Sequence, residues 1–160
     1  MPLSTIDNTG LSQSQILSAI NMPTGSVIQV VQAVTQNSTS TTSSSYGAVT
    51  NLSLSITPNF TSSKILLFAN FGTIYTLSSS ASGATTFYRN GSDIAPTTRG
   101  FMLNSFTQQG PSSMMYLDSP SSTSSITYQV YFKTNSSTLI IGGTDGGVAT
   151  SSTITAMEIR

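Results

Sequence analysis

The chain has no cysteine, no histidine and no tryptophan among its 160 residues. Without cysteine there are no disulfides, thiol nucleophiles or thiolate metal ligands, and without histidine no imidazole can activate a serine. Charge is also scarce, because five Lys and Arg and five Asp and Glu make up 6% of the chain, against roughly 25% in a typical globular domain. We therefore expect no metal ion and no cofactor.

The scarcity of charge also limits the partners. The five basic residues stand singly along the chain, at Lys64, Arg89, Arg99, Lys133 and Arg160. A protein that binds phosphates needs a basic stripe, and so does one that binds an anionic membrane surface. No apolar run approaches the roughly 18 residues of a membrane-spanning helix, and the first ten residues lack the basic start of a signal peptide. The sequence predicts neither nucleic acid nor a membrane as a partner.

The carboxylates give little support to catalysis. A pair for glycoside hydrolysis would have to come from five acids, Asp7, Asp93, Asp118, Asp145 and Glu158. Each lies in or beside a predicted turn or a terminus, where Asp ordinarily binds the local backbone. The stretch GGTDGG supplies one carboxylate, which is too few for a calcium loop. We therefore expect a protein that is not an enzyme.

The chain does contain many hydroxyls and short apolar runs. Ser and Thr make up about a third of it, and 37% of the residues are hydrophobic, which is too high for a disordered polar chain. The predicted strands lie at 26–35, 52–57, 64–75, 85–94, 114–117, 126–133, 138–141 and 153–159. The most apolar run, 64–75, should be a central buried strand that bends or breaks at Gly72. Asn90-Gly91 is a strong signal for a tight hairpin.

These runs predict an all-β fold. Turn-forming linkers join them without an intervening helical pattern, which is typical of a jelly-roll-like antiparallel β-sandwich. We expect this head to span residues 26–160, with an N-terminal arm at residues 1–25. Two Ser/Thr-rich tracts, 37–47 and 76–85, have no apolar periodicity and should be exposed loops.

The arm carries the one helical signal. Ser12 and Gln15 have the spacing of a capping box, and the apolar positions that follow, Ile16, Leu17 and Ile20, fall on one helical face. Because so short a helix is marginal in water, it needs a surface on which to dock. We take these three residues as the candidate anchor.

Three of the aromatic residues stand apart from the predicted strands. Tyr46, Phe101 and Phe106 lie in or beside loops, where an aromatic ring can stack on a sugar. Packing inside the protein is the alternative for all three. Most of the other aromatics lie in the predicted strand runs and should be core residues or subunit contacts.

Four segments together resemble a known group of proteins. MPTGSVIQVVQAVT, LSLSITPNFTSSKILLFANF, FYRNGSDI and SSTITAMEIR are similar, in order and spacing, to short virion structural proteins of phages of marine and freshwater bacteria, of the tail-fibre-head or capsid-decoration type. The resemblance implies a β-sandwich or jelly-roll head, commonly trimeric, on the particle exterior and without enzymatic activity. The chain departs from long fibres in having no shaft repeat, collagen-like repeat or heptads.

The expected function follows from this resemblance and from the arm. We expect an exterior capsid decoration or cement protein, a homotrimer that its arm attaches to the major capsid protein or another virion protein. The alternative is a receptor-binding head of a tail fibre that contacts host surface glycans through loop hydroxyls and aromatics. A capsule-cutting depolymerase is a third class, which the missing histidine and sparse carboxylates disfavour.

Overall fold

In a computed structural model of the chain, the described residues are 22–95, 100–104, 107, 109–145 and 148–160, and every regular element among them is a strand. The strands are β1 (Val27–Thr35), β2 (Thr39–Thr41), β3 (Gly47–Ile56), β4 (Lys64–Thr76), β5 (Gly83–Arg89), β6 (Ser92–Asp93), β7 (Met102–Asn104), β8 (Gly110–Asp118), β9 (Ile126–Thr134), β10 (Leu139–Ile141), β11 (Gly143–Asp145), β12 (Val148–Thr150) and β13 (Ser152–Ile159). Within the described ranges, no helix is long and apolar enough to cross a membrane. The prediction of an all-β fold is confirmed.

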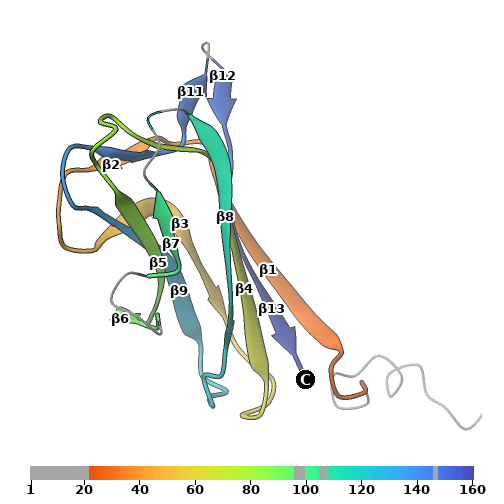
Figure 1. The fold of residues 1–160 in the computed structure, drawn as a ribbon. Coiled ribbons are helices and arrows are strands. Elements are labelled where there is room, and N and C mark those ends of the chain that lie inside the picture. The colour runs from red at the N-terminus through yellow and green to blue at the C-terminus, as the bar shows by residue number, and fades with distance from the viewer. Residues whose placement is uncertain (1–21, 96–99, 105–106, 108, 146–147) are drawn as a thin grey trace, which may run out of the picture.

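Two antiparallel sheets form a sandwich-like structure. The first sheet has the order β1-β13-β4-β10-β2, with β8 paired to the other edge of β4. The second has the order β3-β9-β5-β6, with β7 also paired to β5. Figure 1 shows the second sheet on the left, the long strands of the first sheet on the right, and the hairpin of β11 and β12 at the top.

The core lies between the sheets. Along β9, and along β4 as far as Thr73, every second side chain is buried, as the two-residue period of a strand requires. The largest side chains that are fully buried include Leu52, Leu67, Phe71, Phe87 and Tyr128. They come from both sheets, so the core is shared and holds the two layers together.

β4 is the central strand of the first sheet, as predicted. It pairs with β13 over Lys64 to Phe71 and with β10 over Ile74 to Thr76. Between these stretches, Gly72 donates its N–H to Ser151 O at 3.1 Å, and the register with β8 shifts. Gly72 therefore lies where β4 changes partners, at the predicted irregularity.

The predicted hairpin is confirmed. Asn90 and Gly91 have φ of 49° and 81°, and Arg89 pairs with Ser92 across them. Two central residues with positive φ form the turn that matches the twist of the flanking strands.

Three sequence predictions need adjustment. The tract 76–85 is not an exposed loop throughout, because β5 begins at Gly83 and Thr85 is buried. The tract 37–47 contains the short strand β2, and β3 begins at Gly47 rather than at Leu52. Both changes arise from pairing partners distant in sequence, because β2 adds to β10 and β3 to β9. The helix expected in the arm lies outside the described residues.

Candidate functional surfaces

The candidate anchor residues Ile16, Leu17 and Ile20 lie outside the described residues, so their role stays a prediction. The described chain begins beside the end of β13. Gly25 donates its N–H to Arg160 O at 2.6 Å, and the Arg160 side chain donates to the carbonyl of Met22. The point at which the arm joins the head is therefore fixed at the lower end of the first sheet (Figure 1).

Tyr46 belongs to a group of side chains on the outer face of the second sheet. We call Tyr46, Tyr88, Tyr131 and Lys133 the tyrosine cluster. The rings of Tyr88 and Tyr131 stack with their centroids 3.7 Å apart, and Tyr46 meets Tyr88 edge-on at 6.3 Å. The Lys133 ammonium lies 4.2 Å from the centroid of the Tyr46 ring. These four side chains therefore pack on one another.

The hydroxyl of Tyr46 is buried beneath the backbone at Gly100. It has no hydrogen-bond partner among the described residues, and a Cβ at Gly100 would lie 2.6 Å from it. Burial, helped by Asp93 and Tyr88, raises the pKa of Tyr46 to about 12. Burial likewise raises the pKa of Tyr88. Both phenols are therefore neutral at physiological pH.

Phe101 packs against the core. Its ring centroid lies 5.6 Å from that of Phe87 and 4.7 Å from that of Tyr116, and the side chain is half-buried. These contacts favour packing as the role of Phe101. Phe106 lies outside the described residues, and its role as a contact stays a prediction.

Two acids of the sequence analysis, Asp118 and Glu158, lie inside the sandwich near its lower end. Both pair across the first sheet with Ile65, one on each side of β4. Two strand spacings of about 4.8 Å separate them, which is close to the spacing of some carboxylate pairs in glycosidases. Their hydrogen bonds, however, are with the protein itself.

Glu158 is fully buried and holds the loop between β3 and β4. Its carboxylate accepts hydrogen bonds from Ser63 Oγ at 2.6 Å, from Asn59 N at 2.7 Å and Nδ2 at 2.9 Å, and from Gln29 Nε2. Burial opposes the charged form, but these hydrogen bonds outweigh it and lower the pKa of Glu158. A carboxylate that is shielded from solvent and held ionised by internal hydrogen bonds is suited to a structural role.

Asp118 joins the two sheets. Both of its oxygens lie 3.0 Å from Arg89 Nη1, and one accepts a hydrogen bond from Tyr128 Oη at 2.6 Å. Burial and this hydrogen bond raise the pKa of Tyr128. In the described part of the chain, no group of three or more His, Cys, Asp or Glu side chains could hold a metal ion.

The outer side of the first sheet carries a broad apolar surface. One row across the sheet runs from Val30 through Met157 and Leu66 to Leu117. In the adjacent row, Phe68 pairs with Met115 on one side and with Thr155 on the other. We call the apolar members of these rows the apolar face: Val30, Leu66, Phe68, Met115, Leu117 and Met157.

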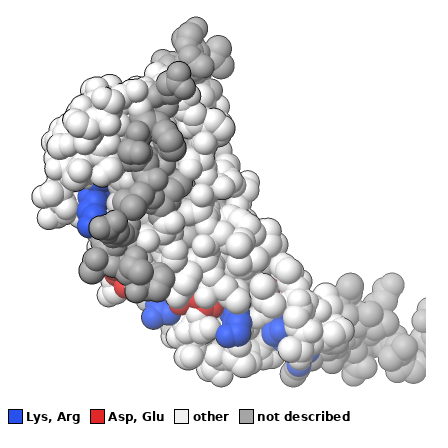
Figure 2. All heavy atoms as spheres, viewed as in Figure 1, with Lys and Arg blue, Asp and Glu red and all other residues white. Residues whose placement is uncertain are grey.

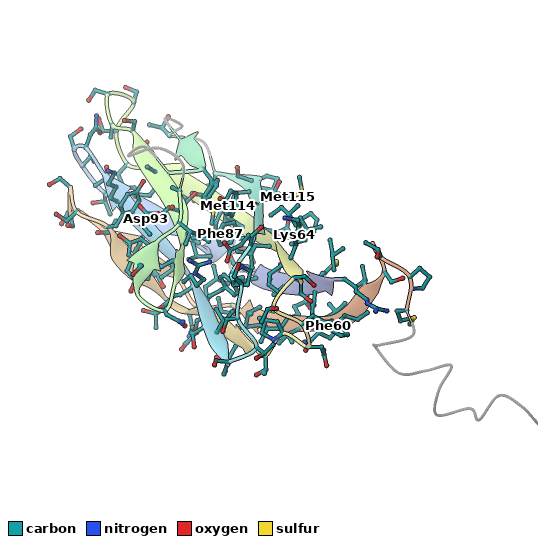
Figure 3. The ribbon with its side chains drawn as sticks, turned by 90° about the horizontal axis from the view of Figure 1, so that it is seen from below. Phe60, Lys64, Phe87, Asp93, Met114 and Met115 are labelled. Atoms are coloured by element: carbon teal, nitrogen blue, oxygen red, sulfur yellow. The ribbon has the colours of Figure 1, made fainter. Side chains whose placement is uncertain are left out.

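The members of the apolar face on the two outer strands are the most accessible. Met115 is 60% exposed, Val30 55% and Leu117 45%. Figure 3 shows Met114 and Phe87 inside the sandwich and Met115 directed away from them. In Figure 2, which has the view of Figure 1, the visible charged side chains lie toward the lower end and one margin of the molecule.

The apolar run of β4 predicts a central buried strand, but over Lys64 to Gly72 only one side of this strand is fully buried. Leu66 and Phe68 are half-buried, because the second sheet covers the inner side of β4 alone. Two neighbouring methionines, Met114 and Met115, carried the missed signal, since successive side chains of a strand face opposite sides. The candidate surfaces are thus the apolar face and the tyrosine cluster.

Comparisons with known proteins add no relative: no protein-family model matches this chain, and no curated protein is detectably similar to it in sequence.

Proposed function

We propose that this chain is a non-enzymatic structural protein of a bacteriophage particle, a decoration or cement protein on the capsid exterior. Residues 26–160 act as a jelly-roll-like head, three copies associate, and the arm, residues 1–25 with its short helix, binds the major capsid protein or another virion protein. The apolar face carries this proposal. Uncovered apolar surfaces are characteristic of proteins that work by association.

Two further observations support the proposal. The virion location rests on the segments 22–35, 52–71, 87–94 and 151–160, which resemble short phage virion proteins. The structural role agrees with the internal hydrogen bonds of Asp118 and Glu158, which engage both carboxylates in holding the sandwich together.

The tyrosine cluster favours one alternative, a tail-fibre head that contacts host surface glycans. Tyr and Lys side chains on an outer sheet face offer stacking and hydrogen bonding to a sugar. The contacts among Tyr46, Tyr88 and Tyr131 leave less ring surface for a ligand, so we rank this function second.

Quantitative mass spectrometry of purified particles tests the proposal. A decoration protein should be found in amounts comparable to the major capsid protein and should remain on tailless capsids. A few copies that separate with the tails would support the fibre alternative. Absence from purified particles would contradict both functions.

A further inference from the structure

We infer that a second copy of this chain packs on the apolar face, and that this face forms the interface of the trimer. The inference rests on the proposed function, because it assigns the surface through which the proposed trimer associates. It concerns the head alone and leaves attachment to the capsid to the arm.

The size of the apolar face suits an interface. Four strands at a spacing of about 4.8 Å, with two rows of outward side chains that together occupy about 13 Å along the strands, give a flat area of roughly 250 Å². An exposed apolar patch of a few hundred Å² on a single chain is often functional. It makes up about a third of the roughly 800 Å² that each partner buries in a standard interface, and the exposed Val27 and Val34 of β1 extend it.

The pattern of polarity also matches an interface. None of the six residues of the apolar face is charged. On β13, β4 and β8 the next row of outward side chains is polar, because Thr153 pairs with Asn70 and Asn70 pairs with Ser113. At the other end lies Lys64, whose ammonium is 3.0 Å from Ser119 Oγ. An apolar centre with a polar rim is the usual anatomy of a protein interface.

The shape of the face provides a place for protruding side chains. A shallow groove over β13 is lined by Val30, Gln32, Phe68, Asn70, Thr155 and Met157. It forms because Thr155 is short and stands between Gln32 and Phe68 in the same row. Met115 and Leu117 project from β8 at the edge of the same face. A neighbouring copy therefore brings both the protruding side chains and the groove that can receive them.

A second copy fits this face better than the arm does. The apolar positions of the predicted helix, Ile16 to Ile20, span about 6 Å along a helix axis, whereas the face extends over roughly 20 Å across the four strands and about 13 Å along them. The contacts within a trimer are head-to-tail, so Met115 and Leu117 of one copy would meet the groove over β13 of the next copy, and the residues on both sides of this contact are uncharged. Because the chain has zero net charge, the copies do not repel one another strongly.

Two matched double variants of the full chain test the inference. V30K/L117K places two charges on the apolar face, and T50K/S55K places two on exposed positions of β3 in the opposite sheet. Sedimentation velocity at micromolar concentration should find a trimer for the wild type and for T50K/S55K. V30K/L117K should be a monomer, with self-association weakened roughly tenfold or more and with an unchanged circular dichroism spectrum.

A thiol-protection measurement gives an independent readout. Since the chain lacks cysteine, M115C and S55C each introduce a single thiol at an exposed strand position. In the oligomer, M115C should react with a maleimide about tenfold more slowly than S55C, because reactivity follows access. Adding V30K/L117K to M115C should remove this protection.

The outcomes separate the inference from the proposed function. The inference is overturned if the wild type is a monomer or if V30K/L117K leaves its oligomer intact. In either case the mass spectrometry of purified particles still tests the proposed function separately. If I16D/I20D dissociates the oligomer as well as V30K/L117K does, the arm holds the copies together and the inference is wrong. If the wild type is a dimer that V30K/L117K dissociates, the apolar face is an interface between copies, but the proposed trimer is wrong.

Discussion

Glu158 is the clearest case of a single side chain that organises its surroundings. Its carboxylate lies at the end of β13 and receives hydrogen bonds from β1 and from the loop that leads into β4, through Gln29, Asn59 and Ser63. Without the carboxylate, the buried Ser63 hydroxyl and the part-buried backbone and side-chain donors of Asn59 would lose this acceptor. A buried donor that is left without an acceptor destabilises the fold by more free energy than an ordinary hydrogen bond contributes on balance.

We predict that Glu158→Gln lowers the free energy of unfolding by about 3 kcal/mol at neutral pH, because an amide cannot accept from all of these donors. The folded-state pKa of Glu158 is below the ordinary value of 4.5. Its contribution is therefore present above pH 4.5 and is lost as the pH falls through the folded-state pKa. Urea unfolding of both proteins should find the difference smaller near pH 3. A difference that stays constant with pH would contradict this assignment.

The turn at Asn90-Gly91 requires a positive φ at both of its central residues. Gly91 has a φ of 81° and open space where a Cβ would lie. We predict that Gly91→Val lowers the free energy of unfolding by roughly 1 kcal/mol or more, because a β-branched residue adopts positive φ with difficulty. Gly47→Val is the matched control, since Gly47 also has open space and lacks the positive φ. Equal losses in the two variants would show that the turn conformation is not the cause.

At the scale of the elements, β4 combines three roles. It pairs with β13 and β8 over its first half, changes to β10 after Gly72, and supplies both core and outer-face side chains. The change of partner brings the backbone at Ser151 close to Gly72, with a hydrogen bond of 3.1 Å. A side chain at position 72 would occupy the space of that backbone.

We predict that Gly72→Ala is destabilising by about 2 kcal/mol. The added Cβ would lie 2.5 Å from Ser151 O and 3.0 Å from Thr150 Cβ, and backbone atoms cannot move aside as a flexible side chain can. Gly47→Ala, in an open position of β3, should be close to neutral in the same urea titration. If both variants unfold alike, the contact at Ser151 is not tight in solution.

At the scale of the whole molecule, the proposed head associates with other copies of the chain and the proposed arm attaches it to the capsid. Met22, Gly25 and Ser26 are bound to Arg160 at the end of β13. The last residues of the proposed arm, from Met22 to Gly25, therefore already contact the end of β13.

We predict that deletion of residues 1–21 leaves the thermal unfolding of the head cooperative and abolishes its attachment to capsids that lack the protein. The three arms of a trimer would bind together, so the loss should be large. Ile16→Asp with Ile20→Asp should mimic the deletion, because the two charges would be buried without partners against the apolar capsid surface that the arm is proposed to bind. Co-sedimentation with capsids measures both. A truncated chain that still co-sediments fully would show that the arm is not the anchor.

Much of the fold was predictable from local patterns. The two-residue alternation at 52–57, the apolar run of β4 and the Asn90-Gly91 turn are properties of neighbouring residues, and each predicted strand is present in the structure. The short strands β2 and β7 were not predictable, because each exists by pairing with a strand far away in sequence.

The sequence by itself determined that this is an all-β chain without His or Cys chemistry, because composition and strand periodicity are readable residue by residue. The tertiary structure alone decided which side of each strand is covered. Met114 and Met115 are chemically identical neighbours, yet one is 5% and the other 60% exposed. Their difference arises from the second sheet, which covers one side of β8 and leaves the apolar face open to a partner.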